Sequence, residues 1–198
     1  MKYINQKQYP HIPYITRTQM EGEAREKGLK TTISSSGCGL CASIMTADRL
    51  IPNCEFGLEE AIALSYEAKA NGLPGTYWKE YVPAFTEKFN LHNENTCDTE
   101  RLLHCLRTGG AAMCITNGDH DGYVGVFSHG KHWITLIGQE PDGRIAVLDP
   151  SCVEGKFEEE GRKGKVEMKN GVIALCDLQV LVEETQGRDP AFFLFWRK

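Results

Sequence analysis

The sequence predicts an α+β domain with a helical N-terminal half and a sheet-rich C-terminal half. Up to about residue 108, apolar side chains recur at helical spacing between residues that cap or stop helices. From about residue 109, short β-rich runs alternate with turns that contain Gly, Asn or Asp. Helices followed by antiparallel strands are typical of the α+β class. We therefore expect a single domain over residues 1–198, with a helical half at about 37–108 and a sheet half at about 109–198.

Four helices are expected in the helical half. Residues 1–36 are expected to be extended or irregular, with a strand at 9–15, so that regular structure begins after Gly37. The first helix follows Gly37, because apolar residues recur at Leu40, Ile44 and Ala47, and it ends before Pro52. The other three helices are expected at residues 58–72, 77–89 and 98–110.

The second half is expected to form strands around one short helix. The predicted strands are residues 111–116, 123–127, 132–138, 144–149, 165–168, 171–175 and 191–196, and the helix is residues 177–185. The turn "QEPDG" predicts a hairpin between the third and fourth of these strands. The polar run 154–167 is expected to be a solvated loop or sheet edge.

Composition narrows the class of protein. With 198 residues the chain can form one sizeable core, and its net charge of -5 is made of mixed acidic and basic groups. This argues against nucleic acid or an anionic membrane as partner. No apolar run approaches the ~20 residues of a membrane span, and the N-terminus lacks the apolar core of a secretory signal. We expect a cytoplasmic protein, unless a leader has been removed, with its eight cysteines mostly reduced.

Cys38 is the first candidate for chemistry. It stands between Gly37 and Gly39 where the first helix is expected to begin. Free N–H groups and the positive end of the helix dipole stabilise a thiolate at such a position, and can lower a thiol pKa from about 8.5 into the range of about 3.5–7.5. The two glycines would let a substrate backbone approach closely. Cys38 is therefore a candidate nucleophile.

His132 and Asp149 are the candidates for a base and a group that orients it. His132 begins the apolar run "HWITLIG", and Asp149 ends the neighbouring predicted strand in "VLDP". A hairpin of these two strands would allow the carboxylate to hold one ring nitrogen of the histidine. The order and spacing permit Cys38, His132 and Asp149 to act as nucleophile, base and orienting residue.

Longer segments strengthen this interpretation. The segments "TTISSSGCGLCASIM" and "GKHWITLIGQEPDGRIAVLDP", together with the order of the runs over residues 30–198, resemble the bacteriocin-processing (double-glycine leader) peptidases, in particular their stand-alone branch among the papain-like cysteine peptidases. The resemblance implies a papain-like fold and a cysteine peptidase that hydrolyses a peptide or amide bond through a thioester. It also implies that Cys38, His132 and Asp149 are catalytic, that the substrate is a peptide or protein, and that neither metal nor organic cofactor is required.

The resemblance also implies a glutamine in the oxyanion hole, upstream of the nucleophile. About six residues before Cys38 the chain has Thr32, and the nearest upstream glutamine is Gln19. We expect Gln19 to supply this donor, with a hydroxyl of Thr32 or Ser34 as the substitute.

Other interpretations of single motifs are weaker. Cys38 and Cys41 form a C-x-x-C pattern, but no strong strand precedes it as in redox proteins, and Cys41 is expected in the core. His129 and His132 lack further zinc ligands. The run 117–122, "NGDHDG", resembles a calcium loop, but Ser128 stands where a bidentate glutamate is expected, so a polar turn is favoured.

Two other classes of function stay open. An acyl or amide transferase could use the same thioester, since an amine can capture it as well as water. A catalytically silent peptide-binding domain could use the same fold. The sequence has no transmembrane segment that would belong to export machinery, so leader removal in cis is not expected. The sequence does not determine the natural substrate or the oligomeric state.

Overall fold

The centre of the molecule is a seven-stranded sheet in which every neighbouring pair is antiparallel. The computed structural model describes residues 1–14, 32–72 and 75–198. The strand order is β3-β9-β4-β5-β6-β8-β7. The strands are β3 (Leu91–Thr96), β4 (Ala111–Thr116), β5 (His132–Gln139), β6 (Ile145–Leu148), β7 (Val166–Lys169), β8 (Ile173–Cys176) and β9 (Phe192–Arg197), and a separate hairpin pairs β1 (Asn71–Gly72) with β2 (Gly75–Thr76).

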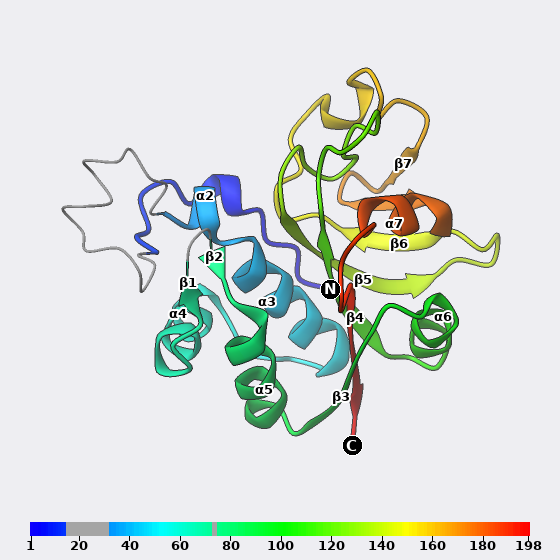
Figure 1. Cartoon of the computed structure of the whole chain (residues 1–198). Helices are drawn as coiled ribbons and strands as arrows, with labels where there is room; N and C mark the ends of the chain where they lie inside the picture. The colour runs from blue at the N-terminus through cyan, green and yellow to red at the C-terminus, as the bar shows by residue number, and fades with distance from the viewer. Residues whose placement is uncertain (15–31, 73–74) are drawn as a thin grey trace.

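Helices cover both faces of this sheet (Figure 1). Helices α3, α4 and α5 lie on one face, and α6 and α7 lie on the other. The helices are α2 (Ile33–Ser36), α3 (Cys38–Leu50), α4 (Leu58–Glu67), α5 (Trp78–Lys88), α6 (Thr99–Arg107) and α7 (Leu178–Glu184), with 3-10 turns η1 (Gln6–Gln8) and η2 (Lys156–Glu158). The sheet therefore separates two hydrophobic cores.

Strand β4 contributes side chains to both hydrophobic cores. All six of its residues are buried. Ala111, Met113 and Ile115 belong to the core under α3, whereas Ala112 and Cys114 belong to the core under α6. Because neighbouring side chains of a strand point to opposite faces, a strand covered on both sides needs a continuous apolar run. This explains the segment "AAMCIT".

Helix α3 is fixed along strand β5 by two side-chain hydrogen bonds. The Thr135 hydroxyl donates to the carbonyl oxygen of Ala42 over 2.9 Å. The Arg49 Nε donates to the carbonyl oxygen of Ile137 over 2.8 Å. Later residues of the helix thus contact later residues of the strand, so the first residues of α3 and β5 lie at the same end of the sheet.

The α+β class and most of the expected elements are confirmed, with four exceptions. The expected strand at 123–127 is absent, and the described part of the expected strand at 9–15 makes a single bridge from Pro13 to Thr32. Residues 91–96 form β3, which takes part in the sheet although it lies in the predicted helical half. Regular structure also begins earlier than expected, with the 3-10 turn η1 and helix α2.

The polar run 154–167 is only partly the solvated loop or edge that was predicted. Its end forms the edge strand β7, but Lys156, Phe157 and Arg162 are buried. Phe157 packs edge-on against Phe127 at 6.0 Å between ring centroids, and the Arg162 Nε donates to the carbonyl oxygen of Gly125. Tertiary contacts to other segments therefore bury side chains that the local pattern predicts to be exposed.

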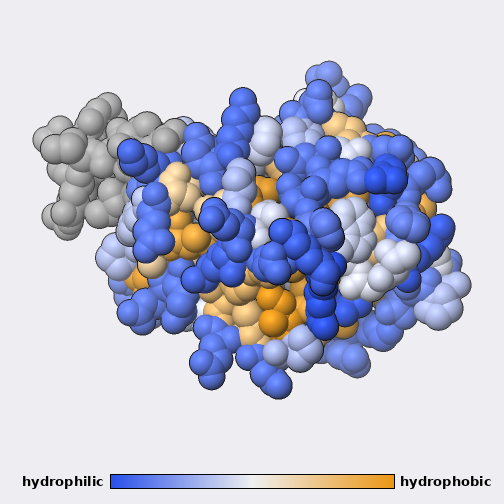
Figure 2. Space-filling view, turned by 90° about the horizontal axis from the view of Figure 1, so that it is seen from below, coloured by the Kyte–Doolittle hydropathy of each residue, from blue (hydrophilic) through white to orange (hydrophobic). Residues whose placement is uncertain are grey.

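The surface of the molecule is largely hydrophilic, as the mixed acidic and basic composition leads one to expect. Figure 2 shows hydrophilic side chains over most of one face, around a limited apolar patch. None of the helices in the described ranges combines the length and apolarity that would be needed to cross a bilayer. All eight cysteines are free in the structure.

Candidate active site

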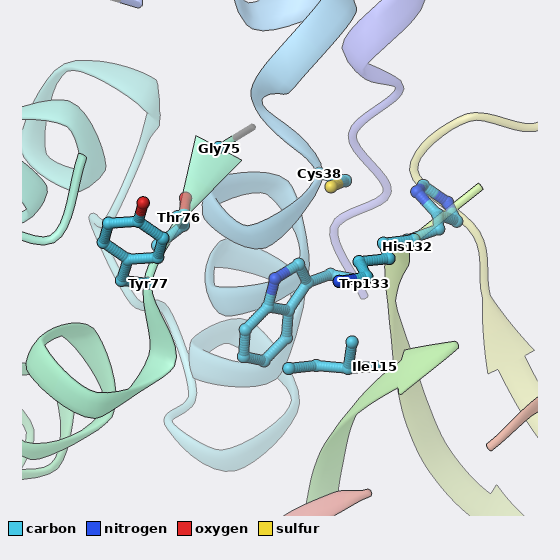
Figure 3. Close-up of a pocket in the computed structure, with 8 residues that line it drawn as sticks. Cys38, Gly75, Thr76, Tyr77, Ile115, His132 and Trp133 are labelled. Atoms are coloured by element: carbon cyan, nitrogen blue, oxygen red, sulfur yellow. The ribbon is translucent and has the colours of Figure 1, made fainter. Parts of the chain in front are cut away.

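The structure brings Cys38, His132 and Asp149 together at one end of the sheet. Cys38 is the first residue of α3 and His132 is the first residue of β5. Thr135 pairs with Leu148 across β5 and β6, so the chain that leaves β6 at Asp149 runs back beside His132. Figure 3 shows the Cys38 and His132 side chains at the cavity, each from its own element.

The environment of Cys38 favours the thiolate. Burial opposes its ionisation, but hydrogen bonding and positive charge from His132 outweigh this and lower the pKa of the thiol below its ordinary value. Hydrogen bonds from the backbone of Trp133 and Gly39 act in the same direction. As a whole residue Cys38 is of intermediate exposure, so a small reagent can reach it.

His132 contacts Asp149 through its second ring nitrogen. The His132 Nε2 lies 2.8 Å from Asp149 Oδ1, and the side chains are 5% and 1% exposed. Burial opposes the imidazolium, but the hydrogen bonds to Asp149 and Cys38 and their negative charges raise the pKa of His132 to about 9. Burial likewise opposes ionisation of Asp149, yet hydrogen bonding and charge from His132, with the charge of Lys156, hold its pKa well below the usual range. The arrangement stabilises a thiolate and an imidazolium together.

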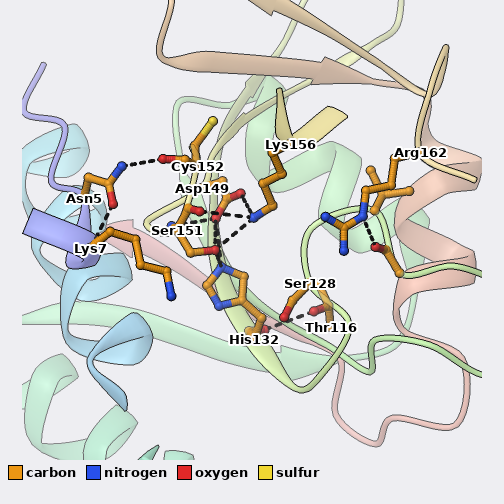
Figure 4. Close-up of polar contacts among 12 residues, drawn as sticks. Asn5, Lys7, Thr116, Ser128, His132, Asp149, Ser151, Cys152, Lys156 and Arg162 are labelled. Atoms are coloured by element: carbon orange, nitrogen blue, oxygen red, sulfur yellow. Dashed lines mark hydrogen bonds and ion pairs between the residues drawn. The ribbon is translucent and has the colours of Figure 1, made fainter. Parts of the chain in front are cut away.

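Ser151 and Lys156, which follow β6 in the chain, also contact the Asp149 carboxylate (Figure 4). The Ser151 backbone N–H donates to Asp149 Oδ1 over 2.8 Å, and its hydroxyl oxygen lies 3.1 Å from the same atom and 3.0 Å from His132 Nε2. The Lys156 Nζ donates to Asp149 Oδ2 over 2.5 Å and to the Ser151 hydroxyl oxygen over 2.9 Å. Neither residue was predicted from the sequence, because nothing in the chain order pairs them with Asp149.

A cavity of about 210 Å³ opens beside the thiol. It is lined by Cys38, Gly75, Thr76, Tyr77, Ile115, Lys131, His132 and Trp133 (Figure 3). Gly39 packs against two of these lining residues, since a Cβ there would lie 2.9 Å from Thr76 Cβ and 3.4 Å from Trp133 Cδ1. The cavity lies next to Cys38, with residues of β2 and of the start of β5 in its lining.

The N-terminal segment, residues 1–8, forms hydrogen bonds with the chain on two sides of the site. The Tyr3 hydroxyl donates to the carbonyl oxygen of Asp149 over 2.8 Å, and the Gln6 backbone N–H donates to that of Pro150 over 2.7 Å. The Gln6 side chain is 3% exposed and donates from Nε2 to the carbonyl oxygen of Ser34, four residues before Cys38. The segment thus contacts the chain before the nucleophile and the turn after Asp149.

Gln6 is a candidate for the oxyanion hole that sequence reasoning missed. Gln19, the expected donor, lies outside the described residues. The Thr32 hydroxyl contacts that of Ser35 at the start of α2, while Ser34 contributes its carbonyl oxygen to Gln6. Gln6 could not be chosen by distance in sequence, since 31 residues lie between it and Cys38. Its burial next to the chain that leads into α3 is the observation that identifies it.

The weaker motifs fit the plain interpretations. Cys41 is fully buried, as expected for a residue of the core, and burial followed by the charge of Cys38 raises its pKa. Asp119 of the calcium-like loop accepts from the Gly125 N–H and contacts His129 at 2.9 Å, as in a polar turn. Among the described residues no group of three His, Cys, Asp or Glu side chains is placed to hold a metal ion.

Comparison with known proteins supports the fold. The sequence matches no model of a known protein family and no curated protein. Among solved structures it is similar to a protein from Bacillus anthracis described provisionally as a C39-like peptidase, with a TM-score of 0.52, 10% identity and coverage of 100% of this chain and 99% of that chain. At this identity the likeness establishes the fold. The papain-like α+β class predicted from the sequence is confirmed.

Proposed function

We propose that the protein is a papain-like cysteine peptidase that hydrolyses a peptide or amide bond. One observation carries the proposal: His132 interacts with a thiol at the first turn of a helix on one side and with a buried carboxylate, 2.8 Å away, on the other. An imidazole between a thiol and an oriented acid is the arrangement that activates a cysteine nucleophile. The peptidase-like fold and the resemblance of the Cys38 and His132 segments point in the same direction.

The reaction would proceed in two stages. The Cys38 thiolate attacks the substrate carbonyl carbon, and His132 donates its proton to the leaving amine as the amide bond breaks. Water then attacks the resulting thioester while His132 accepts its proton, which releases the acid and restores the thiolate. Asp149 keeps the imidazole oriented throughout. An amine in place of water would give acyl transfer by the same steps, so product analysis with an added amine separates the two reactions.

The oxyanion would be stabilised from two sides. The backbone N–H of Cys38 belongs to the first turn of α3, where amide groups have no acceptor within the helix. We assign the second donor to the Nε2 of Gln6, which is buried beside α2 and would exchange its hydrogen bond to Ser34 for one to the substrate oxygen. Gln19 is the alternative donor.

Within the papain-like peptidases we place the chain with the stand-alone relatives of the bacteriocin-processing enzymes. The support is the order of the Gly-Cys-Gly segment, the Gly-x-His strand and the Asp-Pro turn in the sequence. The substrate would be a peptide or protein bound in an extended form across Cys38. The triad chemistry itself requires neither metal nor organic cofactor.

The proposal is tested by the rate at which iodoacetamide labels Cys38 between about pH 4 and about pH 9, read by peptide mass spectrometry. The exposed Cys97 is the reference thiol in the same sample. We expect labelling of wild type to persist well below the ordinary thiol pKa and to weaken in His132→Ala. If Cys38 titrates like an ordinary thiol and His132→Ala leaves this titration unaltered, the peptidase proposal is overturned and a peptide-binding domain is favoured.

A further inference from the structure

We propose that Lys156 is a positioning residue of this site: its ammonium group fixes the Asp149 carboxylate and Ser151, and through them holds His132 toward Cys38. The inference rests on the proposed function, because it assigns a role in that site. Lys156 lies in η2, within the run that the sequence predicts to be solvated, and is 9% exposed.

The two oxygens of the Asp149 carboxylate have different hydrogen-bond partners. Asp149 Oδ1 faces His132 Nε2 and the backbone and hydroxyl of Ser151. Asp149 Oδ2 accepts from Lys156 Nζ over 2.5 Å. With both oxygens occupied, rotation of the carboxylate would break a charge-assisted hydrogen bond. Lys156 therefore fixes the plane of the carboxylate, with one oxygen toward the imidazole and the other toward the ammonium group.

Ser151 links the ammonium to the imidazole directly. A lysine ammonium is only a donor, so the Ser151 hydroxyl oxygen must accept from Lys156 Nζ at 2.9 Å. The hydroxyl proton is then directed to Asp149 Oδ1, and the same oxygen lies 3.0 Å from His132 Nε2. Lys156, Ser151 and Asp149 thus form a closed set of contacts on the side of the imidazole away from the thiol.

The ammonium group of Lys156 balances the net charge of the triad. Thiolate, imidazolium, carboxylate and ammonium sum to zero, whereas the triad alone carries one buried negative charge. Asp149 is 1% exposed, and a buried carboxylate requires a partner. The ionisable groups that face His132, Asp149 or Lys156 are Cys38 from α3, Glu184 from α7, Tyr3 from the N-terminal segment and Cys152 from the turn after β6.

This arrangement predicts how the loss of the ammonium group affects His132. Without the positive charge behind Asp149, the field at the imidazole becomes more negative, so His132 retains its proton to higher pH. The carboxylate also becomes free to turn, so fewer molecules hold the imidazole toward the thiol. A merely structural lysine would alter stability but leave the titration of His132 in place.

The experiment compares Lys156→Met and Lys156→Arg with wild type and with Lys169→Met. Lys169 pairs with Glu140 at 2.8 Å on the edge of the sheet, and its substitution is the matched control for losing a lysine ion pair away from the site. The readouts are the pH midpoint of His132 from its imidazole NMR resonances and the labelling rate of Cys38.

We expect Lys156→Met to raise the His132 midpoint by about one pH unit and to slow labelling several-fold. Lys156→Arg should return both values toward wild type, and Lys169→Met should change neither. Equal His132 midpoints in Lys156→Met and Lys169→Met would overturn the inference. Neither readout needs a substrate, so this result leaves the proposed function intact, whereas an ordinary Cys38 titration in wild type overturns the proposed function itself.

A second measurement does not depend on the folding of a variant. In wild type the Lys156 ammonium resonance should be protected from exchange with water and should move as His132 titrates. A rapidly exchanging signal that does not respond to His132 would overturn the inference even if Lys156→Met does not fold.

Discussion

The hydroxyl of Thr135 donates a hydrogen bond of 2.9 Å to the carbonyl oxygen of Ala42, and this bond joins the strand that carries His132 to the helix that carries Cys38. Both residues are fully buried. The two reactive groups thus belong to different elements whose relative position is fixed three residues into the strand and four residues into the helix. This contact helps to fix the position of the Cys38 thiol relative to the His132 imidazole.

Thr135→Val should therefore reduce reactivity as well as stability. The isosteric change leaves one less partner for the Ala42 carbonyl and should lower the free energy of unfolding by about 1 kcal/mol. It should also slow iodoacetamide labelling of Cys38, since the helix and strand can shift. Thr86→Val is the control, because that hydroxyl bonds within α5 to the carbonyl of Val82. Equal labelling rates in both variants would contradict the prediction.

The proposed peptidase activity should fall on the alkaline side with a midpoint near pH 9. Contacts to Asp149 and Cys38 raise the pKa of His132 to about 9, so the proton needed by the leaving amine is present below that pH and is lost above it. Asp149→Asn removes the largest favourable contribution and should move the midpoint down. The measurement is kcat/KM against pH on a peptide cleaved by wild type. An unchanged midpoint in Asp149→Asn would argue against the assignment of this midpoint to His132 held by Asp149.

Gln6→Ala should separate turnover from thiol reactivity. Loss of an oxyanion donor lowers kcat by about 10²–10³, whereas alkylation by iodoacetamide forms no oxyanion and should proceed nearly as in wild type. Gln8→Ala is the control, because Gln8 is exposed in the same 3-10 turn. Gln19→Ala tests the donor expected from the sequence. If Gln19→Ala loses turnover and Gln6→Ala does not, the assignment of Gln6 is wrong.

Gly39→Ala should narrow the cavity beside the thiol. The added methyl group would meet Thr76 at 2.9 Å, so the wall must move into the space that a peptide would occupy. We expect a peptidyl chloromethyl ketone to react more slowly while small iodoacetamide still reacts. Gly138→Ala adds the same methyl group to β5 where nothing lies within 4 Å, and it should leave both rates unaltered. Similar slowing of both reagents in Gly39→Ala would count against a steric effect.

The sequence predicts those parts of the fold and site that have a local signal. Helical spacing predicts α3, and the turn "QEPDG" predicts the hairpin that places Asp149 beside His132. The triad could be proposed because one member begins a helix and the others stand at the ends of paired strands. Each of these features is encoded within a few neighbouring residues.

The rest depends on contacts between distant segments. Strand β3, "LHNENT", is polar and becomes a strand because all six residues pair with β9, about a hundred positions later. Lys156 lies among acidic and basic neighbours that suggest a solvated loop, but its ammonium group is buried because Asp149 and Ser151 accept hydrogen bonds from it. Gln6 is distant in sequence from every other residue of the site. No periodic pattern identifies such residues.

Strand β9 follows every other strand in the chain, yet it lies between β3 and β4 in the sheet. During synthesis on a ribosome, β3 and β4 must therefore wait for the segment Phe192–Arg197 before the sheet can close. Contacts of such long range make folding slow. The growing chain would carry the Cys38 segment until β9 has been made and the complete sheet could form around it, which would delay the appearance of a reactive thiol until then.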